Sequence, residues 1–250
     1  MTAPVEVRRL ATPQDLFHAA AEEVIRAASD AVRERGRFTF ALSGGSTPRN
    51  LYTLIAANAS ATLPWDKMFF FWGDERNVPP DDPDSNYRMA KESLLSRVPI
   101  PAGNIFPVPT GKGDAGASAD DYEKTLRRFF DLKPGEVPRF DVILLGMGPD
   151  GHTASLFPET AALKEHSRLV VANWVEKLKA SRITFTLPVL NAARRVIFLV
   201  SGGDKAPVLK EVLEGKGPAE KYPSKLVHPS DGRLIWLVDR AAASELSKAT

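Results

Sequence analysis

Cysteine is absent from the 250 residues of the chain, and histidine occurs only four times. The lack of cysteine excludes disulfide bonds, thiolate nucleophiles, zinc ribbons and iron–sulfur clusters, and it fits a protein of a reducing cytoplasm. The histidines form neither a His-Glu-x-x-His motif nor another ligand pair at helical spacing, so we expect no metal centre. The Gly-x-Ser-x-Gly motif of many serine hydrolases is also missing.

Long apolar runs and a surplus of one charge are missing too. The chain carries 33 Lys and Arg against 31 Asp and Glu, a net charge of +2. Because these charges are interspersed, we expect no nucleic-acid partner. The longest apolar stretches, 68–72 and 142–145, have the length of strands, and residues 1–10 hold no secretory core, so we expect no membrane partner. Any anionic partner should therefore be small and locally recognised.

The apolar segments alternate with helical patterns along the whole chain. Thr12 before Pro13 predicts the start of a helix that runs to Gly36. Further helices are expected at 50–58, 85–96, 117–132 and from about Lys205 to 213, with an alanine-rich helix at the end of the chain. Strands are expected at 37–42, 67–72, 140–145, 168–173, 182–187, 195–200 and 233–238. Apolar strands separated by helices indicate an α/β fold with a mainly parallel sheet, and nothing divides residues 1–250 into more than one domain.

Four polar or glycine-rich turns directly follow predicted strands. They span Ser43–Thr47, Gly73–Arg76, Gly146–His152 and Ser201–Lys205. In open α/β sheets the ligand lies beyond the carboxyl ends of the strands. We therefore expect the four turns to converge on one site.

The first of these turns has the residues that a phosphate group needs. Gly44 and Gly45 let backbone amides approach an anion, Ser46 and Thr47 add hydroxyl groups, and a helix N-terminus follows. No Gly-Lys-Ser/Thr sequence follows, so the turn is not a P-loop. The alternative is a structural turn in which one of the hydroxyl groups caps the helix.

The third turn matches Gly-x-Gly-x-x-Gly, but its chemistry argues against a dinucleotide. Asp150 would place a carboxylate where pyrophosphate should bind, and residues 169–172, about twenty positions on, are apolar and include no ribose-binding acid. The turn instead places Asp150 two residues before His152, which could act as a general base with a pKa near neutrality, the working pH. The alternative is a histidine that is bonded to the loop for structural reasons.

Charged residues mark the remaining turns. Arg76 could bind a phosphate through its guanidinium fork, while Asp74 and Glu75 could hold sugar hydroxyls or Arg76 itself. The alternative is a surface ion pair of little energetic weight. Arg182 and Lys205 could add positive charge, although such residues near strand ends are usually solvated.

Three segments together resemble the 6-phosphogluconolactonases of the glucosamine-6-phosphate isomerase/6-phosphogluconolactonase family. They are ALSGGSTP at 41–48, WGDER at 72–76 with Asn86 and Tyr87 downstream, and LGMGPDGHTASLFP at 145–158. Residues 182–188 and 201–205 extend the similarity in the right order. The resemblance implies hydrolysis of 6-phospho-D-glucono-1,5-lactone to 6-phospho-D-gluconate in the oxidative pentose phosphate pathway, without a cofactor. It also implies a Rossmann-like three-layer αβα sandwich like that of the deaminase and ribose-5-phosphate isomerase.

Lactone hydrolysis requires a base, a positioned water and donors for the negative charge on the carbonyl oxygen. We predict His152 as the general base, with no covalent intermediate. Asp150 would orient the imidazole or hold a substrate hydroxyl, and backbone amides of 146–151 would serve as oxyanion donors. The predicted substrate-binding residues are Gly44, Gly45, Ser46, Thr47, Asp74, Arg76, Gly148, Arg182 and Lys205.

Two other functions stay open. Glucosamine-6-phosphate deaminases have a glutamate five residues after the corresponding histidine, whereas this chain has Phe157. A sugar-phosphate sensor without catalytic activity would normally carry a DNA-binding or partner module, and no such segment is evident. For a lactonase we expect a monomer or a weak dimer in the cytoplasm.

Overall fold

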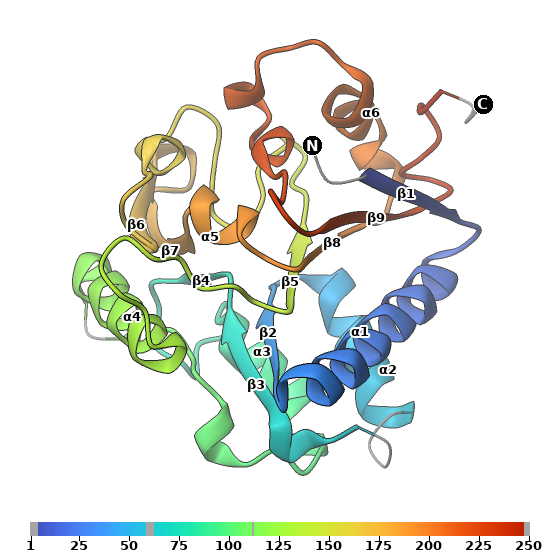
Figure 1. Ribbon diagram of the computed structural model, residues 1–250. Helices are drawn as coiled ribbons and strands as arrows, with labels where there is room; N and C mark the ends of the chain where they lie inside the picture. The colour runs from blue at the N-terminus through green and yellow to red at the C-terminus, as the bar shows by residue number, and fades with distance from the viewer. Residues whose placement is uncertain (1–4, 59–62, 112, 248–250) are drawn as a thin grey trace.

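The computed structural model describes residues 5–58, 63–111 and 113–247, and its largest element is a six-stranded sheet (Figure 1). Every pairing in this sheet is parallel, in the order β1-β9-β8-β5-β2-β3. The strands are β1 (Val5–Leu10), β2 (Phe38–Leu42), β3 (Met68–Trp72), β5 (Val142–Gly146), β8 (Arg195–Val200) and β9 (Arg233–Asp239). The predicted α/β fold with a mainly parallel sheet is confirmed.

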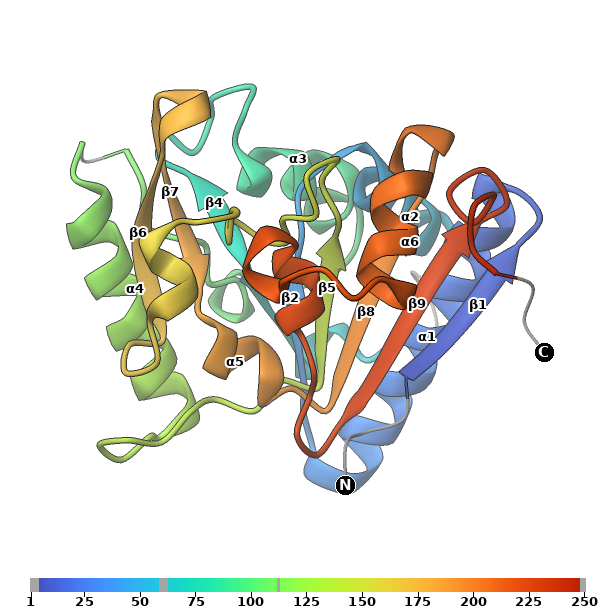
Figure 2. The ribbon, with the colours of Figure 1, turned by 90° about the horizontal axis from the view of Figure 1, so that it is seen from above.

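Helices cover both faces of this sheet. Figures 1 and 2 show α1 (Pro13–Arg35) and α2 (Ser46–Asn58) on one face and α6 (Ala206–Glu214) on the other. The other helices are α3 (Asn86–Ser93), α4 (Ala115–Phe130) and α5 (Leu187–Asn191). The short 3₁₀ helices are η1 (Trp65–Lys67), η2 (Leu95–Arg97), η3 (Ala102–Asn104), η4 (Ala161–Lys164), η5 (Glu176–Leu178), η6 (Gly203–Lys205), η7 (Ala219–Lys221) and η8 (Pro223–Leu226). Within these described ranges, no helix combines the length and the apolar character that crossing a bilayer demands.

The predicted first helix begins and ends as its sequence indicates. Thr12 and Asp15 form a reciprocal capping box, in which each side chain accepts from the backbone N–H of the other residue. Pro13 occupies the first turn, and Gly36 ends the helix in the left-handed conformation with φ of 73°.

A second, antiparallel sheet was not expected. It contains β4 (Asp74–Arg76), β7 (Ala180–Phe185) and β6 (Val170–Val175) in the order β4-β7-β6. The prediction of residues 73–76 as a turn was therefore wrong, and the predicted strands at 168–173 and 182–187 belong to this second sheet. The chain leaves β3 at Gly73, whose carbonyl accepts a 2.8 Å hydrogen bond from the N–H of Phe185, and this contact starts the pairing with β7.

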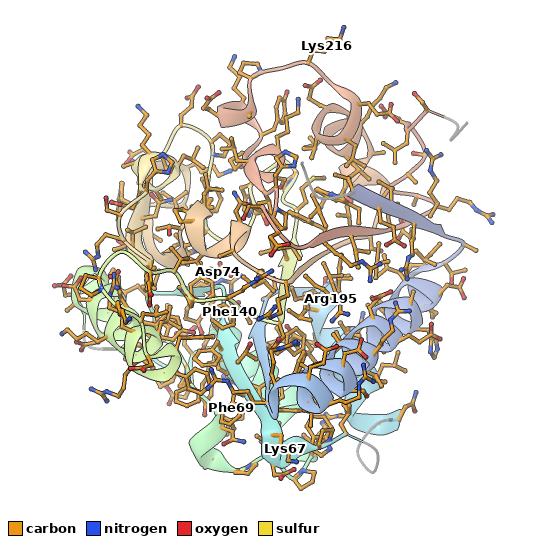
Figure 3. All side chains as sticks on the ribbon, viewed as in Figure 1. Lys67, Phe69, Asp74, Phe140, Arg195 and Lys216 are labelled. Carbon is orange, nitrogen blue, oxygen red and sulfur yellow. The ribbon has the colours of Figure 1, made fainter. Side chains whose placement is uncertain are left out.

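Aromatic side chains join the small sheet to the large one. Phe140, just before β5, lies 5.2 Å from Phe71 of β3 and 5.4 Å from Phe185 of β7, measured between ring centroids (Figure 3). Phe185 also stacks on Tyr122 of α4, and α4 packs along β6 and β7. Fully burying side chains of this size contributes roughly 1.5–3 kcal/mol each, so the two sheets are held together by a substantial apolar contact.

At the ends of the chain, one strand was missed and one predicted helix was wrong. β1 was missed because its sequence, Val-Glu-Val-Arg-Arg-Leu, contains no apolar run; it is an edge strand, and Val5 and Val7 are exposed. The expected alanine-rich helix at the end is absent from the described residues 240–247, which form turns. The Asp239 carboxylate accepts a 2.7 Å hydrogen bond from the N–H of Ala242, and this local bond favours a turn over a helix.

Candidate active site

The candidate site lies where the direction of the sheet connections reverses. From β2 the chain moves outward to β3, whereas from β5 it moves to β8 on the opposite side. Such a switch point opens a crevice beyond the carboxyl ends of the two central strands. A cavity of about 440 Å³ occupies this place, lined by Ser43–Gly45 after β2, by residues 146–149 and His152 after β5, and by Asp74 and Arg76 of β4.

Hydrogen bonds inside the turn after β5 fix its shape. The N–H of Gly148 donates to the carbonyl of His152 at 2.9 Å, and the N–H of Gly151 donates to the carbonyl of Gly148 at 3.0 Å. Gly151 has φ of 77°, a conformation that favours glycine. Because two amides of this turn are already bonded, the expectation that residues 146–151 supply oxyanion donors is wrong for Gly148 and Gly151.

The imidazole of His152 is held on three sides. Its Nδ1 lies 2.5 Å from Oδ1 of Asp150, and its ring stacks on Phe157 with centroids 4.1 Å apart. Gly148 forms the third side, since a β-carbon there would lie 2.1 Å from both Cε1 and Nδ1 of the ring. This position therefore requires glycine, and the hydrogen bond to a carboxylate assigns the proton to Nδ1 and leaves Nε2 as the acceptor.

Burial makes His152 a weakly basic group. It lowers the pKa of His152 from 6.5 to about 4, with Asp74 opposing the change and the positive charges of Lys205 and Arg182 adding to it. We expected a pKa near neutrality, which an exposed loop histidine would have. The imidazole is thus neutral at physiological pH and free to accept a proton.

Lys177 is a site residue that the sequence did not reveal. It lies in η5 at the tip of the β6–β7 hairpin, its Nζ bonds to Oδ2 of Asp150, and it lies 4.8 Å from the ring centroid of Phe157. Lys177 follows Asp150 by 27 positions in the chain, and the sequence around Lys177 is that of an ordinary charged turn. Only the antiparallel pairing of β6 with β7 brings it into the cavity.

The two acids of β4 have different roles. Asp74, near the centre of the molecule in Figure 3, lines the cavity and accepts a 2.6 Å hydrogen bond from Oγ of Ser155. Glu75 points away into the start of α3, where its carboxylate accepts from the N–H groups of Asn86 at 2.7 Å and Tyr87 at 2.8 Å. Burial raises the pKa of Glu75 while these bonds oppose the change. Glu75 therefore holds the helix rather than a sugar hydroxyl.

Arg76 and Arg182 face each other across the small sheet. They are directly opposite in the antiparallel register of β4 and β7, so their side chains share one face, and both line the cavity. Burial and the charge of Arg76 lower the pKa of Arg182. Neither guanidinium forms an ion pair with a carboxylate of the described residues, although Arg76 donates to the carbonyl of Asp84. Two like charges this close favour a bound anion.

The turn after β2 contributes backbone donors. Gly44 packs so closely on Asn86 that a β-carbon would lie 1.9 Å from its Oδ1. Within the part of the chain that the structure describes, the amides of Gly44 and Gly45 donate to no protein acceptor, and both residues line the cavity. The remaining predicted substrate-binding residues, Ser46, Thr47 and Lys205, do not line it, and their contact with substrate stays a prediction.

No group of three or more His, Asp or Glu side chains in the described ranges is arranged to hold a metal ion.

The chain is similar to proteins of known family. The model of the glucosamine-6-phosphate isomerases/6-phosphogluconolactonase family matches residues 11–236. A 6-phosphogluconolactonase from Nostoc is 52% identical over 217 residues, covering 87% of this chain and 88% of the relative, and one from Synechocystis is 47% identical over 216 residues, covering 86% and 88%.

Solved structures agree with these sequences. The 6-phosphogluconolactonase from Trypanosoma brucei superimposes with a TM-score of 0.89 at 31% identity, covering 98% of this chain and all of the other. A monomeric glucosamine-6-phosphate deaminase has a TM-score of 0.80 at 21% identity, covering 96% of this chain and all of the other, and thus shares the fold. The chain belongs to the glucosamine-6-phosphate isomerase/6-phosphogluconolactonase family.

Proposed function

We propose that this protein hydrolyses 6-phospho-D-glucono-1,5-lactone to 6-phospho-D-gluconate. The observation that carries the proposal is a neutral imidazole, bonded to Asp150 through Nδ1, in the same cavity as the facing pair Arg76 and Arg182. A base and a paired cation site in one cavity are what a phosphorylated lactone requires. The relatives named as 6-phosphogluconolactonases support the same activity.

His152 acts on a water molecule in this mechanism. Nε2 removes a proton while the water oxygen attacks the lactone carbonyl carbon, and Asp150 stabilises the imidazolium that forms. The tetrahedral intermediate then collapses, the bond between the carbonyl carbon and the ring oxygen breaks, and the imidazolium returns the proton to that oxygen. The products are a carboxylic acid and a free hydroxyl group, with no covalent bond to the protein.

The phosphate group orients the lactone for this reaction. At neutral pH it carries about −1.5 to −2 charges, which match the two guanidinium groups of Arg76 and Arg182. The unpaired amides of Gly44 and Gly45 add two donors from the turn after β2. Binding the phosphate away from the reaction centre places the lactone carbonyl carbon next to the attacking water, and it does so without tighter binding of the lactone ring itself.

Phe157 disfavours the deaminase reaction. It stacks on His152, at the position where deaminases of this family have a glutamate. Ring opening and isomerisation of an amino sugar need further proton transfers, and an aromatic ring here supplies none. Its contribution is instead to the burial that keeps His152 neutral.

The chain works without a cofactor in this proposal. The absence of cysteine fits a reducing compartment, and we assign the activity to the cytoplasm. We propose a monomer or a weak dimer.

The test measures acid release from 6-phosphogluconolactone and from unphosphorylated gluconolactone, each corrected for spontaneous hydrolysis. We expect strong preference for the phosphorylated substrate, and near-complete loss of turnover in His152→Gln with retained binding of 6-phosphogluconate. Ammonia release from glucosamine 6-phosphate would instead indicate a deaminase. Binding without any turnover would indicate a sensor, and either result would refute the proposal.

A further inference from the structure

A second cavity, of about 250 Å³, lies at the opposite edge of the parallel sheet from the candidate active site. Its wall includes Thr39 near the start of β2 and Asp141 just before β5, whereas the active site follows the other ends of the same two strands. Thr39 and Ser43 are four residues apart along an extended chain, or about 13 Å. The two cavities are therefore separate sites joined by two rigid strands.

Four arginines line this second cavity: Arg35, Arg37, Arg139 and Arg194. Asp141 is the one carboxylate on its wall, so the lining residues carry a net charge of +3. Two more carboxylates touch these arginines from outside. Glu34 pairs with Arg35, and Asp231 pairs with Arg139 at 2.8 Å; their side chains are 53% and 87% exposed, and water screens them accordingly.

Asp141 is already occupied by other protein groups. Its Oδ2 accepts from the N–H and hydroxyl of Thr39 at 2.8 and 2.9 Å, and its Oδ1 lies 3.0 Å from Nη2 of Arg35 and 3.5 Å from Nε of Arg194. These bonds tie the beginnings of β2, β5 and β8 together. The buried carboxylate thus has a structural role that needs two arginines at most.

Arg37 and Arg139 are not needed to bind the Asp141 carboxylate. The guanidinium of Arg37 lies 5.0 Å from the ring centroid of Phe129 and forms no ion pair with the carboxylates of the described residues. Burial lowers the pKa of Arg194, the charges of Arg35 and Arg139 add to this, and Asp141 and Glu34 oppose it. An anion placed here would relieve repulsion among groups that the fold already holds together.

We propose that this cavity binds a phosphate group, either as inorganic phosphate or as the ester of a small metabolite. Arginine forks match phosphate oxygens, and a net lining charge of +3 suits a dianion. The cavity is smaller than the roughly 300–1,000 Å³ that drug-sized ligands occupy, so it holds the phosphate group itself and not a nucleotide. Phe130, Leu132 and Val137, all partly buried, add an apolar wall beside the arginines.

Calorimetric titration tests this proposal without reference to activity. The probes are inorganic phosphate and glycerol 3-phosphate, and the background is the Arg76→Ala/Arg182→Ala variant, which lacks the paired arginines of the active site. We expect this variant to bind one phosphate group, and the further changes Arg37→Gln and Arg139→Gln to weaken that binding at least about tenfold. The control change Arg97→Gln, an exposed arginine in η2, should alter it less than twofold.

The outcomes separate the two phosphate sources and the two sites. Similar affinity for both probes would assign the cavity to the phosphate group of either source, whereas binding of inorganic phosphate alone would restrict it to the free ion. The proposal is wrong if the Arg76→Ala/Arg182→Ala variant binds neither probe, or if Arg37→Gln and Arg139→Gln leave its affinity unchanged. Thermal unfolding of each variant confirms that the fold is retained, and lactone hydrolysis plays no part in the result.

Discussion

Replacing Gly148 by alanine should disable the candidate base while leaving the fold and the phosphate contacts in place. The new β-carbon would lie 2.1 Å from Cε1 and Nδ1 of the His152 ring. Ordinary contact begins at 3.4 Å, so the imidazole must retreat by about 1.3 Å. The backbone itself is not strained by the change, because Gly148 does not adopt a positive φ.

The ring has little room for that retreat. Phe157 stacks on it at 4.1 Å, and the 2.5 Å contact with Asp150 fixes its other edge. A misplacement of about 1 Å in a catalytic group can cost about 100-fold in rate, so we expect kcat of Gly148→Ala to fall by roughly two orders of magnitude. KM should change little, because Arg76 and Arg182, which we propose to hold the phosphate, are on another sheet.

The matched control is Gly146→Ala, two residues earlier in the same segment. A β-carbon at Gly146 would have no neighbour within 4 Å, so this variant should retain nearly full activity. Initial rates of acid release from 6-phosphogluconolactone, with thermal unfolding measured in parallel, give both results. If Gly148→Ala hydrolyses the lactone as fast as Gly146→Ala, the imidazole does not act as the base from this position.

Two further predictions concern the same imidazole. Because the pKa of His152 is lowered to about 4 and the neutral form accepts the proton, kcat at saturating lactone should stay level as the pH falls from 7 to about 5 and then decline around pH 4. The quantity is kcat because kcat/KM also follows the protonation of the phosphate group of the free lactone, whose second pKa is about 6. A decline in kcat centred near pH 6.5, measured with buffers of constant ionic strength, would contradict the burial of the ring. Lys177→Gln should lower kcat up to about tenfold with a smaller effect on KM, because Lys177 holds Asp150 and thereby the ring. The control is Lys179→Gln, which changes an exposed neighbour that pairs with Glu176. Equal losses of kcat in the two variants would show that only the charge of the hairpin matters.

The sequence was sufficient for five of the six strands of the large sheet, all but β1, because those five depend on local patterns. Strands buried on both faces appear as unbroken apolar runs, and each run was followed by a helix or a turn. The small sheet depends on pairing between β4 and β7, which lie about a hundred residues apart in the chain. A three-residue strand with the polar sequence Asp74-Glu75-Arg76 has no periodicity from which to predict that pairing.

The candidate site shows the same division. Asp150 and His152 are two residues apart, so their contact was predictable from one turn. Lys177 was not, because a lysine at a hairpin tip has the same local signal whether it faces solvent or a cavity. Glu75 was misjudged for a related reason: its carboxylate caps a helix that begins eleven residues later, and only the folded loop brings the two together.

The pair of facing arginines in the small sheet is best explained by the ligand that we propose. Placing Arg76 directly opposite Arg182 costs roughly 0.2–1 kcal/mol of stability as a like-charge cross-strand pair, and a phosphate between them would remove that cost. We therefore expect Arg182→Ala to be no less stable than the unmodified protein in phosphate-free buffer, and 6-phosphogluconate to raise the unfolding midpoint of the unmodified protein far more than that of the variant. KM for the phosphorylated lactone should rise at least tenfold in Arg182→Ala, while Arg128→Ala, an exposed arginine of α4, should change neither quantity. The opposite result would be an Arg182→Ala variant that is less stable without ligand but whose unfolding midpoint rises with 6-phosphogluconate as much as that of the unmodified protein. It would show that Arg182 stabilises the sheet and does not bind the phosphate.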